Sequence, residues 1–303
     1  MKKQYPITGT FIDDVTFDMP SSNWSTKQWK KEFDYMKKFG MDTVILMRGS
    51  SYSQSVYPSK YFPTLKKEDE DFARFVFEEA GKRDMQVFMG LAISNLTWND
   101  GDTKGELEKN KIFTQEIVER YGDMPAFKGW YIPHETCENV YNIKDVMGGL
   151  SALCKDKTPD KKVLVSPFFR GTPVDEKNPR SAEATADVWN DIWEIHGKDI
   201  DICAFQDGTA SLEEYPKYLE AMQKVCKEHD IALWSNVETF ERDVRHMFFP
   251  IPFDVLRKKI ELAEKYVEKQ ITFEFSHFLS PQSIFPSARN LSDLYRSYYG
   301  KKK

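Results

Sequence analysis

The sequence predicts an α/β fold, a single (β/α)8 TIM barrel that takes up residues 1–303 as one domain of the catalytic type. Short apolar segments alternate about eight times with amphipathic helical segments, as in such barrels. No stretch rich in Pro, Gly or Ser interrupts this alternation, and no change in composition marks a second domain. A doubly wound sheet is the alternative, but it would normally have fewer strands and a G-x-G-x-x-G turn, which this sequence lacks.

The expected strands are short and apolar, as parallel strands covered on both faces should be. The second strand, residues 43–48, is almost wholly apolar until it reaches Arg48. Turn-forming or polar residues separate each strand from its neighbours. In chain order the strands are expected at residues 7–14, 43–48, 86–93, 129–132, 162–169, 200–207, 231–237 and 270–276.

The expected helices have apolar residues at a spacing of three and four. The first begins near Ser25, buries the face that carries Trp29 and Phe33, and ends at Gly40. A long loop rich in Ser and Tyr, residues 49–63, comes before the second helix. The later helices are expected at about residues 68–83, 104–121, 143–154, 182–195, 212–229 and 253–267.

Composition excludes several classes of function. The net charge is −5 and no basic stripe occurs, so nucleic acid is not an expected partner. No apolar run reaches the roughly 20 residues of a membrane span. The four cysteines include no C-x-x-C pair, which fits neither a zinc site nor a disulfide framework, so we expect free thiols. We expect no cofactor and a monomer or weak homo-oligomer.

The first residues do not resemble a signal peptide. Met1, Lys2 and Lys3 are followed by Gln4 and Tyr5 rather than by an apolar segment. We therefore expect a cytoplasmic protein, unless a removed leader once directed it to the periplasm or outside the cell.

Two glutamates stand at matching places in the repeat. Glu135 follows the fourth strand and Glu238 follows the seventh, and active sites of these barrels lie at the carboxyl ends of the strands. Because ionised carboxylates are rarely buried without partners, we predict that this pair is catalytic. Other polar and aromatic residues near strand ends are predicted to bind a carbohydrate substrate through hydrogen bonds and ring stacking: Asp13, Arg48, Asn95, Trp98, Tyr131, His134, Arg170, Gln206, Asp207, Trp234, Asn236, Glu274 and His277.

Two carboxyl groups suffice for cleavage of a glycosidic bond. One donates a proton to the leaving oxygen, and the other attacks the anomeric carbon or activates water. Glu135 follows apolar residues that would raise its pKa, so it is the expected donor, with Glu238 as the ionised partner. A carboxyl separation of about 5–5.5 Å gives retention of configuration and about 6.5–9.5 Å gives inversion. We expect retention.

Simpler interpretations stay open for these residues. Glu135 could pair with Arg170 or cap the following helix, and Glu238 could begin a polar loop, residues 239–242. Glu274 is a rival for the second acid, or a buried carboxylate bonded to Arg48. The first strand has no histidine, so a catalytic metal is not expected. A non-catalytic glycan-binding barrel and an isomerase or lyase that uses one carboxylate as base are the alternative functions.

Several segments resemble known families. The Gly9–Ile12 strand, the pair Trp24 and Trp29, residues 40–45 and residues 129–131 resemble an uncharacterised family of glycoside-hydrolase-like barrels common in gut Bacteroidetes. The chain also resembles the clan A glycoside hydrolases, which have an acid/base glutamate after strand four and a nucleophile after strand seven. That resemblance implies these roles for Glu135 and Glu238. His134 stands where that superfamily usually has asparagine, which leaves the sugar open, an α-L-fucoside or other deoxy-sugar included.

Overall fold

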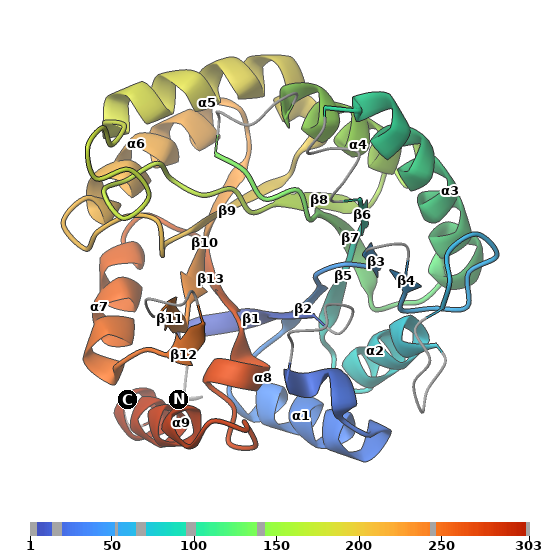
Figure 1. The fold of residues 1–303 in the computed structure, drawn as a ribbon, viewed down its shortest axis with the longest axis horizontal. Coiled ribbons are helices and arrows are strands. Elements are labelled where there is room, and N and C mark those ends of the chain that lie inside the picture. The colour runs from blue at the N-terminus through green and yellow to red at the C-terminus, as the bar shows by residue number, and fades with distance from the viewer. Residues whose placement is uncertain are drawn as a thin grey trace.

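A computed structural model describes residues 5–13, 20–51, 54–64, 71–94, 101–137, 143–242 and 247–300. Eight parallel strands form a closed barrel in the order β1-β13-β10-β9-β8-β7-β5-β2. Figure 1 looks along the barrel, with the helices in a ring around it. The predicted (β/α)8 barrel is therefore confirmed.

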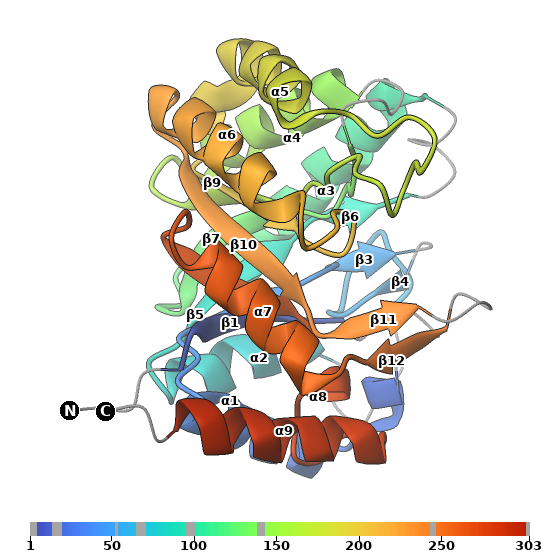
Figure 2. The same cartoon turned by 90° about the vertical axis from the view of Figure 1, so that its left-hand side faces the viewer.

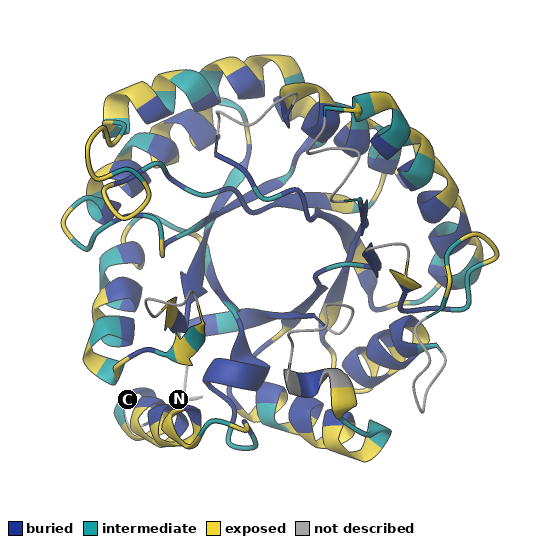
Figure 3. Ribbon diagram, viewed as in Figure 1, coloured by how far each residue is buried: buried dark blue, intermediate teal, exposed yellow. Residues whose placement is uncertain are grey.

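The barrel strands lie where the sequence predicted them, although several end one to four residues earlier. Figure 3 shows that they are buried along almost their whole length, which explains their apolar sequences. Their bounds are β1 Ile7–Ile12, β2 Thr43–Leu46, β5 Gln86–Gly90, β7 Phe127–Ile132, β8 Lys162–Val165, β9 Ile202–Gln206, β10 Ala232–Glu238 and β13 Lys269–Phe273.

The main helices follow the strands as predicted. Ser25 caps the first of them in a reciprocal pair with Gln28, and Gly40, with a φ of 80°, reverses the chain after it. The last helix had no range assigned from the sequence. The helices are α1 Thr26–Lys38, α2 Phe72–Gly81, α3 Thr103–Tyr121, α4 Ile143–Lys157, α5 Ala182–His196, α6 Tyr215–Glu228, α7 Phe253–Ala263, α8 Phe275–Phe278 and α9 Pro286–Tyr299, with short 3-10 turns at Pro20–Asn23 and Gly197–Asp199.

Two small sheets stand at the carboxyl ends of the barrel strands. One contains β3 (Ser50–Ser51), β4 (Gln54–Ser55) and β6 (Ala92–Ile93), and the other pairs β11 (Phe240–Arg242) with β12 (Phe248–Pro250). Figure 2 shows both on the side opposite the chain termini. Loops were expected at residues 49–63 and 239–242, because strands of two or three residues are too short to show a period-two pattern.

The core has an inner and an outer part. The inner part fills the barrel with one cluster of inward-facing side chains, and the outer part packs the helices against the strands. Because side chains alternate along a strand, the inward positions continue upward to the polar residues at the strand ends. In the described part of the chain, no helix is long and apolar enough to cross a membrane. The inner cluster consists of Phe11, Ile45, Met47, Phe88, Tyr131, Leu164, Ile202, Ala204 and Ile271.

Candidate active site

Strand β10 places three residues on one inward face. Trp234, Asn236 and Glu238 are two residues apart, so they form successive layers from the amino end of the barrel to its carboxyl end. Asn236 is buried and donates from Nδ2 to Ser166 Oγ at 3.1 Å. Glu238 is the last residue of the strand, and its side chain is only 8% exposed. The backbone alternation of β10 therefore brings the Glu238 carboxyl to the top of the barrel.

Glu135 lies three residues beyond the end of β7, in a short turn. Its backbone N–H donates to Pro133 O at 3.0 Å, and the next residue, Thr136, accepts the N–H of Phe168 at 2.9 Å. The second bond ties this segment to the chain that follows β8. The Glu135 side chain is partly exposed. It is held at the carboxyl end of the barrel, as the sequence predicted.

Glu135 and Glu238 line the same pocket, whose volume is about 820 Å³. The pocket runs outward from the barrel between the loops after β8 and β9 on one side and β11 on the other. Gln206 lines it beside Glu135, and Arg242 is its exposed cation. Its other lining residues are Phe168, Pro173, Val174, Asp207, Gly208, Thr209, Ala210, Ser211, Leu212, Phe240, Glu241, Val255 and Lys259.

Burial raises the pKa of both glutamates. For Glu238 the result is about 7, with Lys259 and Arg242 opposing the rise and Asp207 and Glu135 adding to it. For Glu135 burial also raises the pKa, against Arg48, Arg242 and a hydrogen bond from Gln206. The negative charge of Glu135 therefore contributes to the raised pKa of Glu238. The raised pKa expected for Glu135 is thus accompanied by a raised pKa of Glu238, the residue expected to be the ionised partner.

Buried Asp13 and half-buried Arg48 form an ion pair just beyond the ends of β1 and β2. The positive charge of Arg48 lowers the pKa of Glu135, and the negative charge of Asp13 raises it. Tyr131, which faces the barrel interior below Glu135, is fully buried, and burial holds its pKa well above the usual range. These three residues lie together beneath the pocket, on the Glu135 side.

His134 is held by a residue that the sequence analysis did not select. Its Nε2 lies 2.8 Å from Oε1 of Glu106, a fully buried glutamate on α3. The same oxygen accepts the backbone N–H of Ser94 at 3.0 Å. The imidazole beside Glu135 is thus fixed by α3. The predicted binding residues Asn95 and Trp98 lie outside the described residues.

Two predicted binding residues are placed away from the pocket. Trp234 lies near the amino end of β10, with the Lys269 ammonium 5.3 Å above its ring, so about 13 Å of strand separates it from Glu238. We therefore correct its role to that of a core residue. Arg170 donates from Nη2 to Asp175 Oδ2 at 2.7 Å. Its ion-pair partner is therefore Asp175, and not Glu135 as one interpretation of the sequence had it. The other interpretation, that Glu135 caps the following helix, depends on residues 138–142, which lie outside the described residues.

Glu274 and His277, the residue before α8 and a residue within it, are buried together. The Glu274 carboxylate contacts His277 Nδ1, and His277 Nε2 accepts the backbone N–H of Ser21 at 3.1 Å. Burial lowers the pKa of His277 to about 3, so the ring is neutral and its single proton lies on Nδ1, facing Glu274. Glu274 is not among the residues that line the pocket shared by Glu135 and Glu238.

Sequence reasoning missed Lys259 and Gly208, which both contact Glu238. Lys259 on α7 donates to the Glu238 carbonyl at 3.2 Å and to Asp207 Oδ1 at 2.9 Å. The sequence did contain an indication that Lys259 is buried, because it lies on the same face of α7 as the apolar residues Leu256 and Ile260. Gly208 gave no signal before the fold was known. Among the described residues, no group of three or more His, Cys, Asp or Glu side chains is arranged to hold a metal ion.

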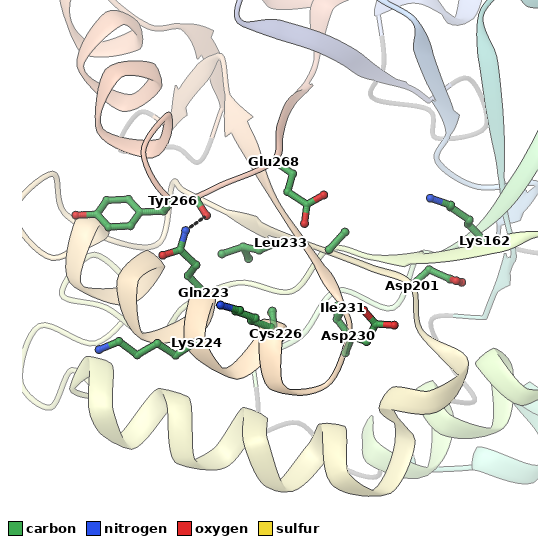
Figure 4. Close-up of a pocket in the computed structure, with 12 residues that line it drawn as sticks. Lys162, Asp201, Gln223, Lys224, Cys226, Asp230, Ile231, Leu233, Tyr266 and Glu268 are labelled. Atoms are coloured by element: carbon green, nitrogen blue, oxygen red, sulfur yellow. Dashed lines mark hydrogen bonds between the residues drawn. The ribbon is translucent and has the colours of Figure 1, made fainter.

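A second pocket, of about 740 Å³, opens at the other end of the barrel (Figure 4). Its residues begin the strands, as Lys162 begins β8 and Ala232 begins β10. Asp201 at this pocket pairs with Lys155 at 2.7 Å and accepts the Val163 N–H at 2.7 Å, which fixes β8 beside β9. Because residues at this face of such barrels serve stability, we assign no activity to it.

Comparison with known proteins places the chain in a family. The model of a domain of unknown function, DUF4434, matches residues 7–285. The chain belongs to the DUF4434 family. A crystal structure described as a "putative alpha-L-fucosidase" from Bacteroides thetaiotaomicron is 34% identical, with a TM-score of 0.92 over 99% of this chain and 95% of that one. A comparison with curated proteins gave no match.

More distant structures share the fold of this DUF4434 protein. An endo-1,4-beta-D-mannanase from Thermotoga petrophila has a TM-score of 0.59 at 12% identity, covering 98% of this chain and 99% of that one. The xylanase TsXylA from Thermoanaerobacterium saccharolyticum has a TM-score of 0.55 at 11% identity, covering 89% and 85%. These neighbours are glycoside hydrolases with (β/α)8 barrels, so the predicted resemblance is confirmed for the fold, and the DUF4434 match confirms that the chain belongs to an uncharacterised family.

Proposed function

We propose that this DUF4434 protein is a retaining glycoside hydrolase, with Glu135 as general acid/base and Glu238 as nucleophile. The observation that carries the proposal is that two carboxyls with raised pKa values, one after β7 and one at the end of β10, line one pocket, and that the charge of Glu135 raises the pKa of Glu238. The glycoside hydrolases that share this fold support it.

The reaction follows from two protonation states. Glu238, ionised, attacks the anomeric carbon while protonated Glu135 gives its proton to the leaving oxygen, which breaks the glycosidic bond and leaves a glycosyl ester on Glu238. Glu135 then takes a proton from water, the water oxygen attacks the anomeric carbon, and the ester bond to Glu238 breaks. Burial serves the first role of Glu135, because a raised pKa keeps its proton available.

The substrate is best sought among terminal sugars. The 34% identical relative is described as a "putative alpha-L-fucosidase", which makes an α-L-fucoside the first compound to test. The pocket supplies hydrogen-bonding groups for sugar hydroxyls in Gln206, Thr209 and Ser211, and apolar surface in Phe168 and Phe240. Tyr131 and His134, which were also predicted to bind the substrate, are buried and are not among the lining residues of this pocket.

A panel of aryl glycosides, headed by aryl α-L-fucoside, tests the proposal with Glu135→Gln and Glu238→Gln. We expect Glu135→Gln to lower kcat by about 10²–10⁴-fold, the usual contribution of a general acid. Glu238→Gln should abolish turnover. Activity that survives both changes would reject the assignment. Sugar binding without turnover in the wild type would favour a glycan-binding barrel, and a product formed without glycosidic cleavage would indicate a lyase or isomerase.

A further inference from the structure

Lys259 is an unusual residue for its place in the fold. It lies on the inner face of α7 with Leu256, Ile260 and Ala263, and only 8% of it is exposed. An apolar side chain would normally fill such a position, because a lysine taken out of water needs a partner. Its partner, Asp207, is also buried, at 1% exposure. Replacing a buried ion pair with apolar residues is often neutral or stabilising, so stability alone does not account for the pair.

The ion pair holds the backbone of Glu238 at both of its polar groups. Asp207 Oδ1 accepts the Glu238 N–H at 3.0 Å, and Lys259 Nζ donates to the Glu238 carbonyl at 3.2 Å. The same two side-chain atoms, Asp207 Oδ1 and Lys259 Nζ, are 2.9 Å apart. A closed set of three contacts therefore fixes the residue that ends β10. Neither side chain needs to touch the substrate to have this effect.

Charge gives the pair a second role. Among the charges near Glu238, the ammonium of Lys259 lowers the pKa of its carboxyl most and the carboxylate of Asp207 raises it most, in addition to the rise from burial. Within the described part of the chain, further charged or titratable groups near Glu238 come from three more elements. They are Arg242 on β11, Glu135 after β7 and Tyr215 on α6. Glu241, next to Arg242, acts on Lys259 from the same side.

We propose that Asp207 and Lys259 are positioning residues for Glu238, which fix its backbone through both N–H and C=O and set the charge that its carboxyl faces. This inference rests on the proposed function for its effect on turnover, because it assumes that Glu238 is the nucleophile. Its effect on Glu238 itself is independent of any activity. The two parts can therefore be tested separately.

The first test follows the Glu238 carboxyl directly. Protein with ¹³C-labelled glutamate side chains is titrated by NMR, and the spectrum of Glu238→Gln identifies the Glu238 signal. Lys259→Met should raise the Glu238 pKa by about 1–3 units, the range for loss of an adjacent opposite charge. Asp207→Asn should lower it, because the amide keeps a carbonyl oxygen for the Glu238 N–H but loses the negative charge. Lys259→Arg should stay near the wild type.

A rise of the Glu238 pKa in Lys259→Met and a fall in Asp207→Asn distinguish this role from a general loosening of the site, which would shift the pKa in the same direction in both variants. Shifts in the same direction, or no shift in either variant, would overturn the proposal. If Lys259→Met does not fold, the double variant Asp207→Asn/Lys259→Met carries the test, since it buries no unpaired charge. Its Glu238 pKa should lie above that of Asp207→Asn, because the two proteins differ only in the positive charge of Lys259, and an equal or lower value would overturn the proposal.

The second test uses a glycoside that the wild type hydrolyses. Lys259→Met should lower kcat more than it raises KM, with a larger loss below about pH 7 than above it, and Lys259→Arg should restore most of the rate. A loss confined to KM, or equal at every pH, would overturn the positioning role. If the wild type hydrolyses no glycoside, the proposed function fails while the NMR titration still decides the role of the pair.

Discussion

The carboxylate of Glu238 lies directly against the backbone of Gly208. A Cβ atom on Gly208 would come within 1.8 Å of Glu238 Oε2, a distance that no native contact shows. Gly208 follows β9 at the edge of the pocket and is itself exposed. A glycine here is needed for close approach rather than for its backbone conformation, since its φ lies outside the left-handed region.

We predict that Gly208→Ala lowers kcat by about 10²-fold while hardly changing stability, because a displacement of about 1 Å in a reacting group can cost that much. The Glu238 carboxylate is the flexible end of a side chain, so it can move aside at small cost to the fold. Kinetics and thermal unfolding of the same sample check both halves. Gly81→Ala on α2 is the matched control, because an added Cβ there would meet only Ala126 Cβ, at an ordinary 3.7 Å. A normal kcat in Gly208→Ala would contradict the placement of Glu238.

The pH dependence of activity should follow Glu238. The nucleophile must be ionised, and burial raises its pKa to about 7, so kcat/KM should fall about tenfold for each pH unit below that value. Arg242 lowers the pKa of both glutamates, so Arg242→Gln should move both limbs of the profile to higher pH. A pH series of kcat/KM for the two proteins measures this. An acidic limb near pH 4.5, the ordinary value for a glutamate, would count against the assignment.

The fold was predictable because its evidence is local. Each strand and helix of the barrel has a hydrophobic period that can be read over ten or fifteen residues, and the capping pair of Ser25 and Gln28 marks where α1 begins. The count of eight strands then placed Glu135 and Glu238 at the same end of the barrel. The two small sheets were not predicted, because a strand of two residues such as Ser50–Ser51 is too short to show alternation of apolar and polar residues.

Much of the site depends on contacts between distant residues. Asp207 and Lys259 are 52 positions apart, and the sequence alone does not show that α7 brings them together. The sequence did hold a weaker signal, a charged residue on an apolar helix face. Lys259 on α7, Glu32 on α1 and Glu106 on α3 all have it, and all three are buried and hydrogen-bonded. Trp234 was wrongly assigned to the site, because it lies near the amino end of β10 whereas the pocket lies at the carboxyl ends of the strands.

Glu32 should make the protein less stable at high pH. It is fully buried, accepts a hydrogen bond from Ser280 at 2.8 Å, and burial raises its pKa to about 8. Since its pKa is higher in the folded state than in the unfolded state, its favourable contribution is complete below about pH 4.5 and is lost as the pH rises through 8. Glu32→Gln should therefore raise the free energy of unfolding near pH 9 by about 2–5 kcal/mol relative to its effect near pH 4.

Glu79 is the matched control with the opposite sign. It is buried on α2 and pairs with Lys82 at 2.6 Å and Arg83 at 2.8 Å, and these cations lower its pKa despite the opposing effect of burial. Its stabilising contribution is present above about pH 4.5 and is lost at lower pH. Glu79→Gln should therefore destabilise the protein at neutral pH and matter less near pH 3. Urea unfolding of both variants across pH checks the pair, and equal pH dependence would contradict both assignments.

Glu274→Gln decides whether the rival acid takes part in the reaction. The Glu274 carboxylate is buried against His277, whose ring is held by the Ser21 backbone, and it does not line the pocket of Glu135 and Glu238. Because a glutamine oxygen can still accept the His277 Nδ1 proton, we expect Glu274→Gln to fold and to keep kcat within about tenfold of the wild type. Glu238→Gln should lose about 10³-fold or more under the same assay. An equally large loss in Glu274→Gln, with unchanged unfolding, would make Glu274 the second acid and would assign Glu238 to substrate binding.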